Sequence, residues 1–131
     1  MTTGFWSIPT DLSLPRAPVS FLKEQAAALR EDTQGSLVGF VGTIPMGPSE
    51  LGYYLTIEAP TLNNYRVTVL SIRHKLVPMY PVTLHTDIFT PATDIAIETE
   101  GEFITELRRI LSSNEMEQIV AALLSQIRAP V

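Results

Sequence analysis

The chain contains no cysteine, which excludes a disulfide framework, a thiolate zinc site and a cysteine nucleophile. It also has no segment approaching the ~20 apolar residues of a membrane-spanning helix. Residues 1–9 show neither the basic start nor the apolar stretch of a signal peptide. We therefore expect a cytoplasmic protein with no membrane partner.

Charged residues are scarce, at 18% of the chain against an average of about 25%. The seven Arg and two Lys are scattered and the net charge is −5, so the basic stripe typical of nucleic-acid binding is missing. The hydrophobic fraction, by contrast, is 45%. Because surplus apolar surface is commonly covered by a subunit contact, we expect a homo-oligomer, in particular a dimer.

The length of 131 residues is close to the commonest size of one domain. Three prolines interrupt residues 1–18, which we interpret as an extended arm that precedes a single α+β domain over 19–131. The arm carries Phe5 and Trp6. Burial of two aromatics favours an arm that lies over its own core, and exchange of the arm with a neighbouring subunit is the alternative.

Apolar residues recur at helical spacing over 19–32, 103–111 and 116–127. The sequence Thr99–Glu102 has the pattern of a capping box, and 112–114 marks a second helix start. No charge interrupts the two later apolar stripes. We expect these stripes to form the core or a helix–helix seam, and the alternative is that the last helix docks in a partner's groove.

The region between the first and second helices has the pattern of β-strands, at 36–44, 53–58, 65–73 and 82–89, with a short edge strand around 95–97. This order predicts an α+β fold: an antiparallel four- or five-stranded meander, preceded by one helix and followed by two helices packed on one face. Gly39 and Gly42 lie within the first strand, which indicates a bulge or a close approach of another segment.

The second and third strands are joined by a turn that contains Asn63 and Asn64. Asn tolerates positive φ, so both residues are interpreted first as turn formers. The alternative is a partner-binding loop made of Asn63, Asn64 and Tyr65. The register that we predict across this turn places three pairs of residues opposite each other: Glu58 with Arg66, Thr56 with Thr68, and Tyr54 with Leu70.

Polar and titratable side chains gather on these strands, and six of them are candidate ligand-binding residues: Tyr54, Glu58, Arg66, His74, His85 and Asp87. The first three offer a phenol, a carboxylate and a cation that suit an anionic or amide ligand, or else form an ordinary cross-strand ion pair. The other three match a two-histidine, one-carboxylate metal set. No His-x-His or His-Glu-x-x-His spacing supports that set, so neither a metal nor another cofactor is predicted.

No catalytic motif is present in the sequence, since Gly-x-Ser-x-Gly, Gly-x-Gly-x-x-Gly and phosphate-loop patterns are all missing. We therefore hypothesise a small non-enzymatic interaction module, of an adaptor, chaperone-like or immunity/antitoxin-like type, that dimerises and binds another protein. The alternative is a small-ligand binder or small enzyme that uses the polar sheet face. A concave pocket with at least three of Glu58, Arg66, His74, His85 and Asp87 favours the alternative, and a flat, apolar sheet face buried between two chains favours the interaction module.

Overall fold

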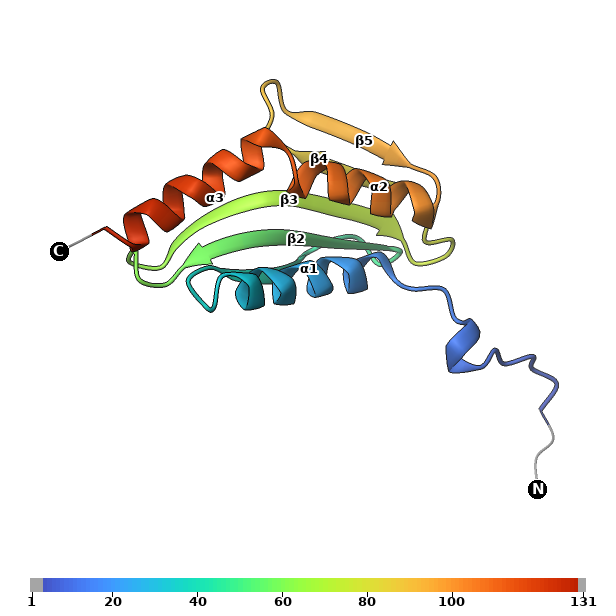
Figure 1. Cartoon of the computed structure of the whole chain (residues 1–131). Coiled ribbons are helices and arrows are strands. Elements are labelled where there is room, and N and C mark those ends of the chain that lie inside the picture. Colours follow the sequence, from blue (N-terminus) through green and yellow to red (C-terminus); the bar gives the residue numbers. More distant parts are fainter. Residues whose placement is uncertain (1–3, 130–131) are drawn as a thin grey trace.

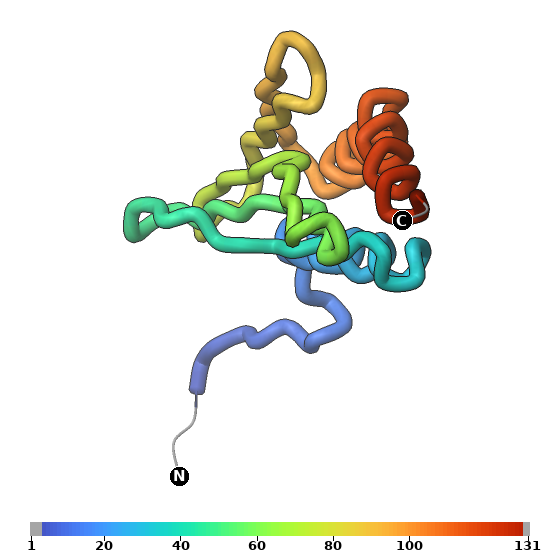
Figure 2. Tube along the Cα trace, turned by 90° about the vertical axis from the view of Figure 1, so that its left-hand side faces the viewer, coloured from blue at the N-terminus to red at the C-terminus, as the bar shows by residue number. Residues whose placement is uncertain are grey.

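The computed structural model describes residues 4–129. Its elements follow in the order η1 (Asp11–Ser13), α1 (Pro18–Asp32), β1 (Val38–Ile44), β2 (Glu50–Ala59), β3 (Tyr65–Lys75), β4 (Val82–Thr86), β5 (Thr93–Ile97), α2 (Glu100–Leu111) and α3 (Asn114–Ile127). The five strands form one antiparallel sheet in sequential order. All three α-helices lie on the same side of this sheet (Figures 1 and 2). The predicted α+β meander is confirmed, with five strands.

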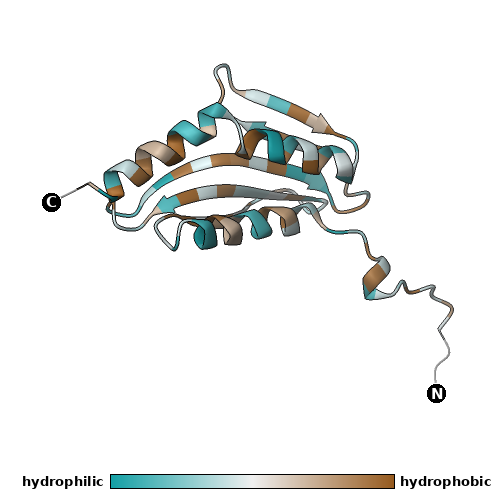
Figure 3. Cartoon of the chain, viewed as in Figure 1, coloured by the Kyte–Doolittle hydropathy of each residue, from teal (hydrophilic) through white to brown (hydrophobic). Residues whose placement is uncertain are grey.

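The core fills the space between the helices and the sheet. Apolar and polar residues alternate along β2 and β3 (Figure 3). Because successive side chains of a strand point to opposite faces, every second one faces the helices. Each helix contributes an apolar stripe to the same space. The fully buried side chains include Leu22 of α1, Ile72 and Leu84 of the sheet, and Phe103 and Ile110 of α2.

A β-bulge in β3 changes the predicted register. Glu58 lies opposite Arg66 and Thr56 opposite Thr68, as expected, but Tyr54 lies opposite Ser71. The predicted Tyr54–Leu70 pair is wrong because β3 contains one extra residue, Val69, which has no partner on β2.

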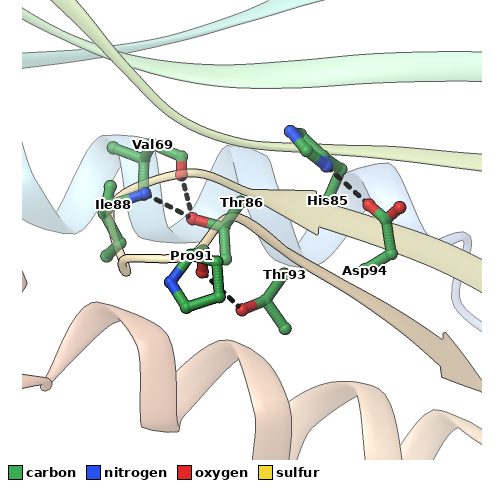
Figure 4. Close-up of polar contacts among 7 residues, drawn as sticks. All are labelled: Val69, His85, Thr86, Ile88, Pro91, Thr93 and Asp94. Atoms are coloured by element: carbon green, nitrogen blue, oxygen red, sulfur yellow. Dashed lines mark hydrogen bonds and ion pairs between the residues drawn. The ribbon is translucent and has the colours of Figure 1, made fainter.

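Both Val69 and Leu70 are fully buried in the core. The bulge takes the backbone of Val69 out of the regular ladder, and the buried Thr86 hydroxyl donates a 2.7 Å hydrogen bond to its carbonyl (Figure 4). Thr86 thus satisfies a buried acceptor that the strand pairing leaves open.

Gly39 and Gly42 mark close approaches, as their positions predicted, whereas the bulge lies in β3. A Cβ atom on Gly39 would lie 2.7 Å from Cβ and 2.9 Å from the carbonyl oxygen of Ala26, so α1 rests directly on the strand. A Cβ atom on Gly42 would lie 2.5 Å from Cε1 of Tyr54, because the tyrosine ring covers that glycine.

The two C-terminal helices begin at the predicted caps. The Thr99 hydroxyl accepts from the Glu102 N–H at 3.2 Å, and the Ser113 hydroxyl accepts from the Met116 N–H at 3.2 Å. The Glu102 carboxylate accepts from the N–H of Glu98, at 2.9 Å, which is one residue earlier than in a standard capping box. The first helix has Pro18 at its first position.

The N-terminal arm leads away from the sheet (Figure 1). Phe5 and Trp6 are 98% and 85% exposed, so the expectation that they cover the core is wrong. The first three residues of the predicted arm and the last two of the predicted domain lie outside the described residues. Within residues 4–129, no helix is both long and apolar enough to cross a membrane.

Candidate functional site: the open face of the sheet

The sheet has one face under the helices and one face over which none of the three α-helices lies (Figure 2). We call the latter the open face. Strand pairing places alternate residues of every strand on it. Its polar and aromatic members include Phe40, Tyr54, Glu58, Arg66, Thr68, Ser71, Arg73, Thr83, His85 and Asp94.

An aromatic and cationic cluster occupies the β1–β2–β3 part of the open face. The rings of Phe40 and Tyr54 lie 6.2 Å apart, and the guanidinium of Arg66 lies 5.8 Å above the Phe40 ring. Arg66 Nε also donates to a carboxylate oxygen of Glu58 at 3.0 Å. The structure therefore brings together Tyr54, Glu58 and Arg66, as predicted, and adds Phe40.

The ion pair within this cluster contributes little to stability. The Arg66 side chain is 60% exposed, and exposed pairs are typically worth well under ~1 kcal/mol. This agrees with the interpretation of Glu58 and Arg66 as an ordinary cross-strand pair. Its geometric effect is larger, because the carboxylate holds the guanidinium beside the Phe40 ring.

A shallow hollow of about 240 Å³ lies on the other half of the open face. Arg73 is one of its lining residues, and within residues 4–129 its guanidinium has no ion-pair partner. His85 pairs there with Asp94 across β4 and β5 (Figure 4). Hydroxyl groups and apolar side chains complete the hollow, from Ser71, Thr83, Ile44 and Met46. The guanidinium and hydroxyl groups of this hollow could therefore bind an acidic group.

The bulge explains why two arginines share the open face. Arg66 and Arg73 are an odd number of residues apart, so in a regular strand their side chains would point to opposite faces. The extra residue Val69 reverses the alternation between them. Both guanidinium groups consequently lie on the side without helices.

The two-histidine, one-carboxylate set of His74, His85 and Asp87 does not form, because His74 and His85 lie on opposite faces of the sheet. His74 lies opposite Val82 under the helices, 6% exposed, with Nδ1 2.8 Å from the Lys75 carbonyl oxygen. His85 lies on the open face, and Asp87 follows the end of β4. Residues 4–129 contain no group of three or more His, Asp or Glu side chains able to hold a metal ion.

Asn63 and Asn64 have positive φ of 59° and 56°, which confirms their interpretation as turn formers. Tyr65 follows them, half exposed at the start of β3. A groove of about 790 Å³ runs between this turn and α3, with Leu62, Tyr65, Val67, Ile119 and Leu123 among its lining residues. The stripe of α3 is thus core only in part, since Met116 and Leu123 are buried and Ile119 is half buried.

The buried hydroxyl of Tyr80 has no hydrogen-bond partner among the described residues. Burial raises the pKa of Tyr80, and the negative charge of Glu100 at the start of α2 adds to the increase. Tyr80 does not line the hollow of the open face and is not part of the Phe40–Tyr54–Arg66 cluster.

Several open-face residues were not predicted from the sequence: Phe40, Ser71, Arg73, Thr83 and Asp94. Phe40 had no usable sequence signal, because apolar residues occupy both faces of β1. Arg73 and Asp94 required the bulge and the β4–β5 register. Comparisons with protein-family models, curated proteins and solved structures gave no match.

Proposed function

We propose that this chain is a small non-enzymatic interaction module that forms a homodimer in the cytoplasm and binds a protein partner through the open face. One observation carries the proposal: a five-stranded sheet leaves a whole face without helices, and that face presents the cluster of Phe40, Tyr54 and Arg66, in which Phe40 and Arg66 are exposed and Tyr54 is half buried.

The residue types of the cluster support a protein partner. Tyr, Phe and Arg are enriched at the centres of protein interfaces, and Tyr and Arg are among the residues whose truncation costs most affinity. The cluster lies on paired strands, so its backbone is already ordered before a partner arrives. Little conformational entropy is then lost on binding.

The positions of the titratable groups also favour binding over catalysis. Of Glu58, Arg66, His74, His85 and Asp87, the hollow on the open face contains only His85. Glu58 and Arg66 lie in the neighbouring cluster, and His74 is on the other side of the sheet. A general acid and base must reach the same substrate atoms, and the Glu58–Arg66 pair, His74 and His85 lie in three different places.

The two halves of the open face indicate the chemistry of the partner. The exposed ring of Phe40 suits an apolar or aromatic side chain, and the guanidinium of Arg73 suits a carboxylate. A partner surface that combines an apolar contact with acidic side chains fits both. Adaptor, chaperone-like and immunity/antitoxin-like proteins all include modules that act in this way, by occupying a surface.

A photo-crosslinking amino acid at Phe40 tests the proposal, with Ala121 on the exposed side of α3 as the matched control position. The protein crosslinked from Phe40 and not from Ala121 is then purified, and its binding is measured by titration calorimetry. We expect Tyr54→Ala and Arg66→Ala each to weaken binding by about tenfold or more, and Arg108→Ala on α2 to leave it unchanged. Equal affinity of all variants would refute the proposal.

The alternative, a small-ligand binder or small enzyme, is favoured by the unpaired Arg73 in the hollow. A thermal-shift panel of inorganic phosphate, acetate and dicarboxylates tests it. A stabilised wild type, an unresponsive Arg73→Ala variant and a normal response of Arg30→Ala would support this alternative. No response of the wild type would leave the interaction module as the better account.

A further inference from the structure

We infer that the outer edge of β1 pairs with β1 of a second copy, so that two chains related by a two-fold axis form one continuous antiparallel sheet. This inference rests on the proposed homodimer and specifies its interface. It concerns the edge of the sheet, whereas the proposed partner binds its open face; Phe40 belongs to both, because it also lines the groove beside β1.

The edge of β1 is unpaired. Val38–Ile44 pairs with β2 on one side only, and half of the N–H and C=O groups of an edge strand point away from its neighbour. Within residues 4–129, no hydrogen bond connects these outward groups to another element. These groups come from alternate residues of a seven-residue strand that another strand can extend.

The edge of β1 also lacks the features that prevent such pairing. Natural edge strands carry charges, prolines or bulges, or are very short. Val38–Ile44 contains none of the first three, and its ladder with β2 is regular. The other edge of the sheet differs: β5 has five residues and carries the exposed Asp94. Within the part of the chain that the structure describes, the edge of β1 is therefore the more open of the two to association.

A groove of about 720 Å³ runs beside this edge, between β1 and α1. Its floor includes Ala26, Ala27 and Val41, which suit the apolar side chains of an added neutral strand. The helix contributes charges of both signs to the lining, with Lys23 and Arg30 as cations and Glu31 as an anion.

A second copy fits this edge better than an unrelated strand because the surface is self-complementary. A two-fold axis places each patch against itself in reverse order. The neutral strand then pairs with a neutral strand, and the cations of one α1 come near the anion of the other. This pairing also covers the apolar part of the groove beside β1, which includes Ala26, Ala27 and Val41.

The N-terminal arm of another copy is the competing occupant. It exposes Phe5, Trp6 and Ile8, but Pro9 lacks an N–H and ends any ladder after a few residues. A strand from a different protein is the other competitor. If the arm holds the dimer, the Phe5→Asp/Trp6→Asp double variant loses it. If the edge serves only a different protein, the wild-type chain is a monomer.

Sedimentation equilibrium of the full chain measures the dimer dissociation constant, and amide hydrogen exchange by NMR reports each N–H of residues 38–44. We expect a dimer in which every amide of β1 is protected, including the alternate ones that a free edge would expose. Thr43→Lys places a charge on the edge and should raise the dissociation constant at least tenfold. Ala96→Lys on β5 is the matched control and should leave it unchanged.

Three results would overturn the inference. A wild-type monomer at every concentration removes the dimer. A dimer whose alternate β1 amides exchange freely has its interface elsewhere. A dimer lost in the Phe5→Asp/Trp6→Asp double variant but kept in Thr43→Lys is held by the arm. Crosslinking of the partner from Phe40 in the Thr43→Lys background separates these failures from a failure of the open-face proposal, because the monomer retains that face.

Discussion

Gly39 and Gly42 stand three residues apart in the same strand, yet the structure predicts different consequences for replacing them with alanine. At Gly39 the added methyl group meets backbone atoms of α1, since the Ala26 carbonyl oxygen lies 2.9 Å from the ideal Cβ position. At Gly42 it meets the ring of Tyr54, which is the far end of a flexible side chain. A ring can rotate away, whereas a helix backbone cannot move without disturbing the core.

The magnitudes follow from these contacts. Alanine in a strand with enough space is favoured over glycine by ~0.5–1 kcal/mol. Overpacking of a core costs about 1–3 kcal/mol, and Gly39→Ala should reach the upper part of that range because the obstacle is backbone. After the alanine gain is subtracted, its free energy of unfolding should fall by roughly 2 kcal/mol. For Gly42→Ala the lost Tyr54–Phe40 contact, ~0.5–1.5 kcal/mol, is largely offset by the alanine gain, so the net change is near zero.

Urea unfolding monitored by circular dichroism measures both variants, with the midpoint read at an unchanged m-value. Gly42→Ala in a Tyr54→Ala background is the control, and there it should stabilise the protein because the ring is gone. Ala26→Gly should fail to rescue Gly39→Ala, since the helix backbone remains in place. Wild-type stability of Gly39→Ala, or a larger loss for Gly42→Ala, would refute the close approach of α1 to β1.

Three further predictions concern buried or capping groups. Thr86→Val removes the donor to the Val69 carbonyl and should lower the free energy of unfolding by about 1–3 kcal/mol. Thr86→Ser keeps a hydroxyl and should lose less of this free energy, and the midpoints of urea unfolding compare the two variants. The pKa of Tyr80 is raised above 10.0, so its contribution to the free energy of unfolding is present below that pH and is lost as the pH rises through the folded-state pKa. Tyr80→Phe should therefore flatten the alkaline fall in the free energy of unfolding, which urea titrations at increasing pH measure. Ser113→Ala removes the hydroxyl that caps Met116 and should cost α3 ~0.5–2 kcal/mol in a thermal melt, with exposed Ser125→Ala as the neutral control.

The order of helices and strands was predictable because each segment carries a local signal. Helical spacing at Phe103, Leu107 and Ile110 and the caps at Thr99 and Ser113 act within one or two turns of a helix. The alternation in β2 likewise predicted which side chains face the core. Such short-range signals also predicted the pairing of Glu58 with Arg66 across the Asn63–Asn64 turn.

The candidate site was predictable only near that turn. The register was correct from Glu58 to Thr56 and failed beyond it, because a single extra residue in β3 is not marked by Gly or Pro. Burial of Val69 and its hydrogen bond to Thr86, 17 residues later, hold the bulge in place. The placement of Arg73 therefore depended on a contact between distant strands.

Local residue patterns thus set the number, type and order of the elements, since hydrophobic periodicity and capping act over a few residues. The convergence of side chains depended on packing between elements. Tertiary contacts put His74 and His85 on opposite faces of the sheet, paired His85 with Asp94, and put both arginines on the face without helices. Each outcome depends on strand pairing across many residues, because a shift of one residue exchanges the two faces of a strand.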